Sequence, residues 1–91
     1  MIPSTEQQFD TVITDCKDIF LKKIIDYGTA WRVLRTISVV DQIFIKALRI
    51  KNIQELKTQK VKDNVEDEWK GIINYAIIGL IQLQLNKPEV E

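Results

Sequence analysis

The chain has 91 residues, 13 basic and 13 acidic side chains, no histidine and a single cysteine. This length favours one domain that buries only about 60–65% of its unfolded surface, and zero net charge argues against a protein that coats nucleic acid. The lone Cys16 excludes an intrachain disulfide, and the lack of histidine excludes His-ligated zinc, so a metal here would be a hard ion such as magnesium.

Neither the N-terminal residues nor the longest apolar run indicates a membrane or secreted protein. The first ten residues lack the basic start and apolar core of a secretion signal. The longest apolar run, residues 72–85, is interrupted by Asn74, Gln82 and Gln84 and is too short to span a bilayer. We therefore expect no membrane partner and a cytoplasmic protein.

The first predicted helix begins near Ser4 or Thr5 and ends at Gly28. Ser4 and Gln7 have the spacing of a capping box, and glycine is the residue type that most readily ends a helix in the left-handed conformation. One face has apolar residues at intervals of three and four, with Lys23 in the same stripe. The apolar members are Phe9, Val12, Ile13, Cys16, Ile19 and Phe20.

A short helix over 30–35, capped by Thr29, and a long helix from Ser38 to about Leu56 are predicted next. Gln42, Lys46 and Arg49 share one face of the long helix, which we expect to be solvated. Its apolar stripe consists of Val40, Ile43, Phe44, Ala47, Ile50 and Ile53. Residues 57–63 are polar without an apolar period and are predicted to be a loop.

The last predicted helix begins at a cap on Asp63 or Asn64 and runs to Asn86. Between residues 72 and 85 it is apolar on nearly every side, and such a helix must be covered on every side. One small chain can hardly do this, so we predict a homo-oligomer, either a dimer or a pairing with a second copy of the same unit. The expected architecture is an all-α domain over 1–86, a bundle of three long helices and one short helix completed by oligomerisation, with a tail or linker over 87–91.

Charged residues near the helix ends are the candidate site. Asp26 lies in the last turn of its helix, where the helix dipole disfavours an anion, so a cation such as Arg35, Lys46 or Arg49 or a ligand is expected beside it. Carboxylates on two facing helices can hold a divalent metal, and the candidate magnesium ligands are Asp26, Glu66 and Glu68. The candidate ligand-binding residues are Lys22, Asp26, Tyr27, Lys46, Arg49 and Asn74.

Structural explanations exist for the same residues. Acids in a first helical turn favour the helix dipole, and a buried amide such as Asn74 is typical of a hydrogen bond between helices. Trp31 and Trp69 are interpreted as core or interface anchors, with a nucleobase platform as the alternative.

Three segments, KKIIDYGTAWRVLR (22–35), DQIFIKALRIKNIQE (41–55) and GIINYAIIGLIQLQL (71–85), resemble a family of small helical bacterial and phage proteins. This family is the nucleotide modification associated domain, type one, and the resemblance is closest to its Bacteroidetes branch, in which two copies of the unit often follow one another. The family pattern maps onto Lys22 or Lys23, Asp26, Tyr27, Gly28, Lys46, Arg49, Glu66, Asn74 and Tyr75. The sequence departs from it at Gly71, where phage relatives tend to carry an acid, and it lacks the EExxE motif of MazG-like enzymes.

The resemblance implies an association with systems that modify nucleotides. Our leading hypothesis is a helical domain that binds a nucleotide or a nucleotide-derived group. The alternatives are a magnesium-dependent, MazG-like nucleoside triphosphate pyrophosphohydrolase and a non-catalytic oligomerisation or interaction module.

Overall fold

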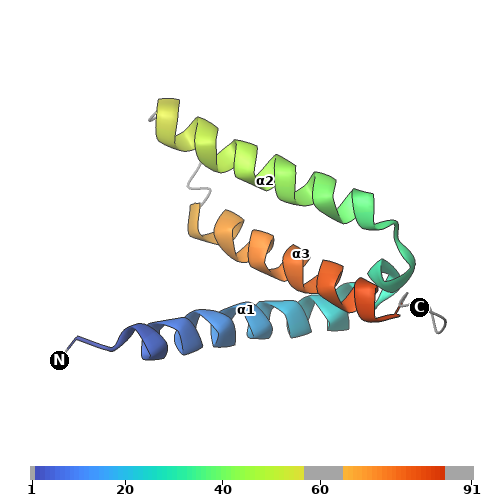
Figure 1. The fold of residues 1–91 in the computed structure, drawn as a ribbon, viewed down its shortest axis with the longest axis horizontal. Coiled ribbons are helices and arrows are strands. Elements are labelled where there is room, and N and C mark those ends of the chain that lie inside the picture. Colours follow the sequence, from blue (N-terminus) through green and yellow to red (C-terminus); the bar gives the residue numbers. More distant parts are fainter. Residues whose placement is uncertain (1, 57–64, 86–91) are drawn as a thin grey trace.

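Residues 2–56 and 65–85 are described by the computed structural model, and within them every regular element is helical (Figure 1). The elements are α1 (Thr5–Tyr27), the 3-10 helix η1 (Ala30–Val33), α2 (Thr36–Leu56) and α3 (Val65–Leu85). The predicted all-α architecture of three long helices and one short helix is confirmed. The predicted loop at 57–63, the caps at Asp63 or Asn64, the end at Asn86 and the tail lie outside the described residues.

The last helix lies between the other two long helices. Figure 1 shows α3 in the middle, with α2 antiparallel to it on one side and α1 running in the same direction as α3 on the other. The packing of α2 on α3 is much more extensive than that of α1 or η1 on α3. None of the helices in the described ranges combines the length and apolarity needed to cross a membrane.

Both predicted ends of α1 are confirmed. The backbone N–H of Gln7 donates to Ser4 Oγ at 3.1 Å, and the Ser4 N–H donates to Gln7 Oε1 at 2.8 Å, which completes the capping box. Gly28 follows the helix at φ +75°, and its N–H donates to the carbonyl of Ile24 at 2.8 Å. Glycine adopts this positive φ without the steric penalty that a Cβ brings, so the chain turns there towards η1.

Two of the predicted caps are wrong. Thr29 makes no capping hydrogen bond through its side chain, and η1 ends at Val33, two residues before the predicted end. Ser38 does not begin α2, because its own N–H already donates to the carbonyl of Arg35 at 3.0 Å. The helix therefore begins at Thr36, and Ser38 lies inside its first turn.

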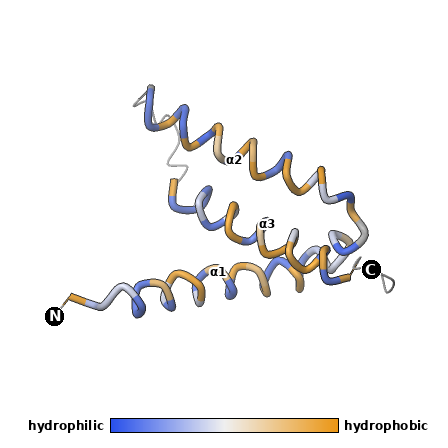
Figure 2. Tube along the Cα trace, viewed as in Figure 1, coloured by the Kyte–Doolittle hydropathy of each residue, from blue (hydrophilic) through white to orange (hydrophobic). Residues whose placement is uncertain are grey.

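The apolar stripe predicted for α2 is only partly the one that faces α3. Val39 and Ile50 are buried, with Ile43 and Ile53 half-buried on the same side. Val40 and Phe44, which belong to the predicted stripe, are exposed by 49% and 65%. Apolar residues recur on successive turns of all three long helices (Figure 2), so spacing alone does not distinguish the packed side of α2 from its outer side.

The excess apolar surface predicted for α3 is present. Trp69, Leu80 and Leu83 of this helix are each more than half exposed, although the surrounding isoleucines are half-buried. The chain by itself therefore leaves α3 incompletely covered, and the interface expected there stays a prediction.

One fully buried amide attaches η1 to α3. Gln82 Nε2 donates to the carbonyl of Trp31 at 2.7 Å and to the carbonyl of Leu34 at 3.0 Å. A short 3-10 segment satisfies few of its own carbonyl groups, so a side chain that supplies two donors positions the connection between α1 and α2.

We expect Gln82→Leu to destabilise the protein by about 1–3 kcal/mol, because an apolar side chain of similar size leaves the carbonyls of Trp31 and Leu34 without these donors. Gln84→Leu, at an exposed position of the same helix, is the matched control and should change the free energy of unfolding little. Urea denaturation followed by circular dichroism measures both. Equal effects of the two substitutions would contradict the structural role of Gln82.

Candidate functional site

A cavity of about 610 Å³ lies between α1 and α3 and is open to solvent. The turn that includes η1 forms part of its wall, and α2 contributes one side chain, Lys46. Most of its wall is apolar, and its charged residues are Lys23, Lys46, Asp67, Glu68 and Lys70. The other lining residues are Ile19, Phe20, Ile24, Tyr27, Gly28, Trp31, Leu34, Gly71, Asn74, Tyr75 and Ile78.

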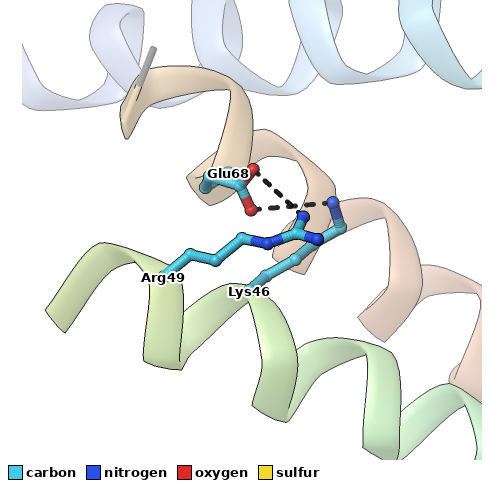
Figure 3. Close-up of polar contacts among 3 residues, drawn as sticks. All are labelled: Lys46, Arg49 and Glu68. Carbon is cyan, nitrogen blue, oxygen red and sulfur yellow. Dashed lines mark ion pairs between the residues drawn. The ribbon is translucent and has the colours of Figure 1, made fainter. Parts of the chain in front are cut away.

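An ion-pair cluster joins α2 to the first turn of α3. Lys46 Nζ lies 3.7 Å from Glu68 Oε2, and Arg49 Nη1 lies 3.6 Å from Glu68 Oε1 (Figure 3). Lys46 and Glu68 are largely buried, whereas Arg49 is more than half exposed. Glu68 Oε2 is buried and accepts no hydrogen bond from the described residues, so the neighbouring cations Lys46 and Arg49 offset the charge of this carboxylate.

Gly71 makes room for Lys46 to cross the surface of α3. A Cβ at this position would lie 2.7 Å from Lys46 Cε and 2.9 Å from Cδ, closer than two carbon atoms normally approach. The lysine continues to the ring of Tyr75, whose centroid is 5.8 Å from Nζ, within the range of a cation–π interaction. The prediction that Lys46 lies on a solvated face is wrong, since the missing side chain at Gly71 lets it pack across α3.

Two further lysines reach the cavity from opposite sides. Lys70 Nζ lies 3.2 Å from Glu66 Oε1, four residues earlier on α3, and hydrogen bonding to Glu66 raises the pKa of this lysine. Lys23 comes from α1 and has no carboxylate partner within the described part of the chain. Lys23 is therefore available to an anion.

Asn74 connects the cavity to the packing of α1 on α3. Its Nδ2 donates to the carbonyl of Cys16 at 3.0 Å, which confirms the predicted hydrogen bond between helices. Asn74 is only 9% exposed, and its Oδ1 accepts no hydrogen bond from the described residues. Cys16 is fully buried, as predicted, and burial raises the pKa of its thiol, which keeps it protonated and unreactive.

Aromatic rings form much of the apolar wall. Phe20 and Trp31 meet edge to face, with ring centroids 5.8 Å apart. Trp31 is half-buried, in accord with its interpretation as an anchor, while Tyr27 lines the cavity with a ring that is 80% exposed. Trp69 is 52% exposed and does not line the cavity.

The structure brings some of the predicted site residues together and leaves others outside. Tyr27, Lys46, Glu68 and Asn74 line the cavity, and Arg49 contacts it through Glu68. The remaining candidates, Lys22, Asp26 and Glu66, do not line it. Within the described residues Asp26 has no ion pair, because Lys46 and Arg49 are turned to Glu68 instead.

The predicted magnesium ligands do not converge within one chain. No three cysteine or carboxylate side chains of the described residues lie close enough to hold a metal ion together. Asp26 is exposed at the end of α1, apart from Glu68 in the cavity wall.

Sequence reasoning missed Lys70 as a cavity residue, and it chose Lys22 as the ligand-binding candidate although the family pattern admitted either Lys22 or Lys23. Lys23 belongs to the apolar stripe of α1, and a cation within an apolar stripe was the available indication that this face borders a polar space. Lys70 precedes Asn74 by four residues and therefore shares its face of α3.

Two glycine substitutions test the crossing of Lys46 over α3. Gly79→Ala meets no atom within 4 Å and should stabilise α3 by about 0.5–1 kcal/mol, since alanine is the better helix former. Gly71→Ala should stabilise less, or not at all, because it displaces Lys46 from Glu68 and Tyr75. Chemical denaturation of both variants decides the point, and equal stabilisation by the two alanines would contradict the close contact.

The sequence matches a known protein family. The nucleotide modification associated domain 1 family matches residues 23–83, which include η1, α2, most of α3 and most of the cavity wall. No curated protein and no solved structure matches the chain. The match covers about two thirds of the sequence and agrees with the resemblance seen in the segments 22–35, 41–55 and 71–85. The chain belongs to the nucleotide modification associated domain 1 family.

Proposed function

We propose that the cavity between α1 and α3 binds a nucleotide or a nucleotide-derived group. The observation that carries the proposal is the grouping of three lysines, Lys23, Lys46 and Lys70, with aromatic residues around one solvent-open cavity. A ligand that suits both kinds of lining carries negative charge and an aromatic or apolar group. A nucleotide has anionic oxygens on its phosphates and an aromatic base.

The dimensions and chemistry of the cavity support this ligand class. A volume of about 610 Å³ is within the usual range of roughly 300–1,000 Å³ for small-molecule sites. Along α3 the lining begins with the charged residues Asp67, Glu68 and Lys70 and ends at the apolar Ile78. At the rise of an α-helix these ends are about 16 Å apart, a distance suited to a ligand with one charged and one apolar end.

The aromatic residues at the apolar end of the cavity could stack on a nucleobase. Tyr27 at the end of α1 and Trp31 in η1 both line the cavity, and a nucleobase gains about 1–3 kcal/mol by stacking on such a ring. The phosphates would then lie towards Lys46 and Lys70, with Lys23 on the opposite wall. Lys46 is held by Glu68 and Tyr75, so its ammonium group is already positioned before a ligand arrives.

Adjacent lysines on α1 provide a matched test. Lys23 lines the cavity, whereas Lys22 is exposed and lies outside the lining. We expect Lys23→Met to weaken nucleotide binding about tenfold, the usual effect of losing one charge-assisted contact, and Lys22→Met to leave affinity unchanged. Isothermal titration with nucleoside mono-, di- and triphosphates, each with and without magnesium, measures the affinities and identifies the preferred phosphate length.

Controls separate binding in the cavity from attraction to the surface. Asp26→Asn removes an exposed charge outside the lining and should not alter affinity. Absence of heat with every nucleotide, from protein whose helical circular dichroism is intact, would refute the proposal. Equal weakening by Lys22→Met and Lys23→Met would refute the assignment of the cavity as the site.

A further inference from the structure

The chain exposes far more surface than a compact protein of its mass. Its accessible area is 7689 Å², whereas a compact monomer of 10.6 kDa exposes about 5,500 Å². Its radius of gyration is 15.6 Å, against about 12 Å expected for this length. Among the described hydrophobic residues only Cys16, Val39 and Ile50 are buried. The core of one chain is therefore small, and much apolar surface is available to a partner.

A row of exposed apolar residues lies on α2. With a rotation of 100° per residue, Ile37, Val40, Phe44 and Leu48 project from one side of this helix, which we call the outer stripe. Their exposures are 51%, 49%, 65% and 44%. Val39, Ile43 and Ile50 project from the opposite side and pack towards α3. The outer stripe thus faces away from α3, and it extends over about three helical turns with Asp41 at its margin.

We propose that a second copy of this chain packs on the outer stripe of α2, forming a homodimer. The area that the chain exposes beyond a compact monomer is larger than the roughly 800 Å² per partner of a standard interface, so enough surface is available for a dimer. Such interfaces are apolar and resemble a domain core cut in half, which agrees with a chain that has so few buried side chains.

Charge and symmetry also favour a second copy as the occupant. The chain has zero formal net charge, so two copies approach each other without net repulsion. A twofold interface uses the same surface on both partners, and an apolar stripe is complementary to itself. Binding on this side leaves α3 and the cavity in place, because the outer stripe and the α3-facing stripe are on opposite sides of α2.

Sedimentation equilibrium of the full chain between 1 and 100 μM tests the proposal. We expect a dimer with twice the mass of the 10.6 kDa chain. Phe44→Glu places a charge at the centre of the outer stripe and should raise the dimer dissociation constant at least about a hundredfold. Ile25→Glu, at an 82% exposed position on α1, is the matched control and should leave the dissociation constant unchanged.

Two further measurements keep the test decisive if the charged variant does not fold. Phe44→Ala removes the ring without introducing a charge and should weaken the dimer about tenfold or more. The melting temperature of the unmodified protein should rise with its concentration, since association stabilises the folded state by mass action. A monomer at 100 μM, a concentration-independent melting temperature, or a dimer weakened by Leu80→Glu on α3 but not by the Phe44 variants would each overturn the proposal.

Discussion

Two buried amides on α3 hold the first third of the chain in place. Asn74 donates to the carbonyl of Cys16 in the middle of α1, and Gln82 donates to two carbonyls around η1. Apolar contact between α1 and α3 is limited, so these directed bonds set the separation and register of the two helices. The cavity exists because α1 is fixed to α3 at these points without being packed against it along its length.

The same bonds explain why an amide is present in a helix that is otherwise apolar. An unpaired amide inside a protein costs about 1–3 kcal/mol, so both side chains are tolerated only where carbonyl groups await a donor. Each uses its nitrogen for the backbone and leaves its oxygen without a partner among the described residues. Asn74 also lines the cavity, so one side chain both joins the helices and forms part of the cavity wall.

The sequence predicted local features well and relative placement poorly. The capping box of Ser4 and the turn at Gly28 depend on neighbouring residues, and both have the expected geometry. Lys46 was misplaced because its position depends on the missing side chain at Gly71, which is 25 residues away. Val40 and Phe44 were misplaced because α2 has apolar residues on two sides. The periodicity of apolar residues identifies a stripe, but it does not show which other helix packs on that stripe. Asp26 was expected to have a cationic partner. Lys46 and Arg49 pair with Glu68 instead, and this pairing follows from how α2 packs on α3.

Helix α2 takes part in both proposals: one side contributes Lys46 to the proposed nucleotide site, and the opposite side carries the outer stripe of the proposed dimer. Phe44 belongs to the outer stripe, and Lys46, two residues later, crosses α3 into the cavity. Any shift of α2 relative to α3 moves Lys46 and Arg49 with respect to Glu68, since all three depend on the register of these helices. A partner that holds α2 from outside therefore restricts the geometry of the ion-pair cluster inside. If dimerisation changes the affinity for a nucleotide by some factor, the nucleotide must change the dimer affinity by the same factor per site, because coupling free energies are reciprocal.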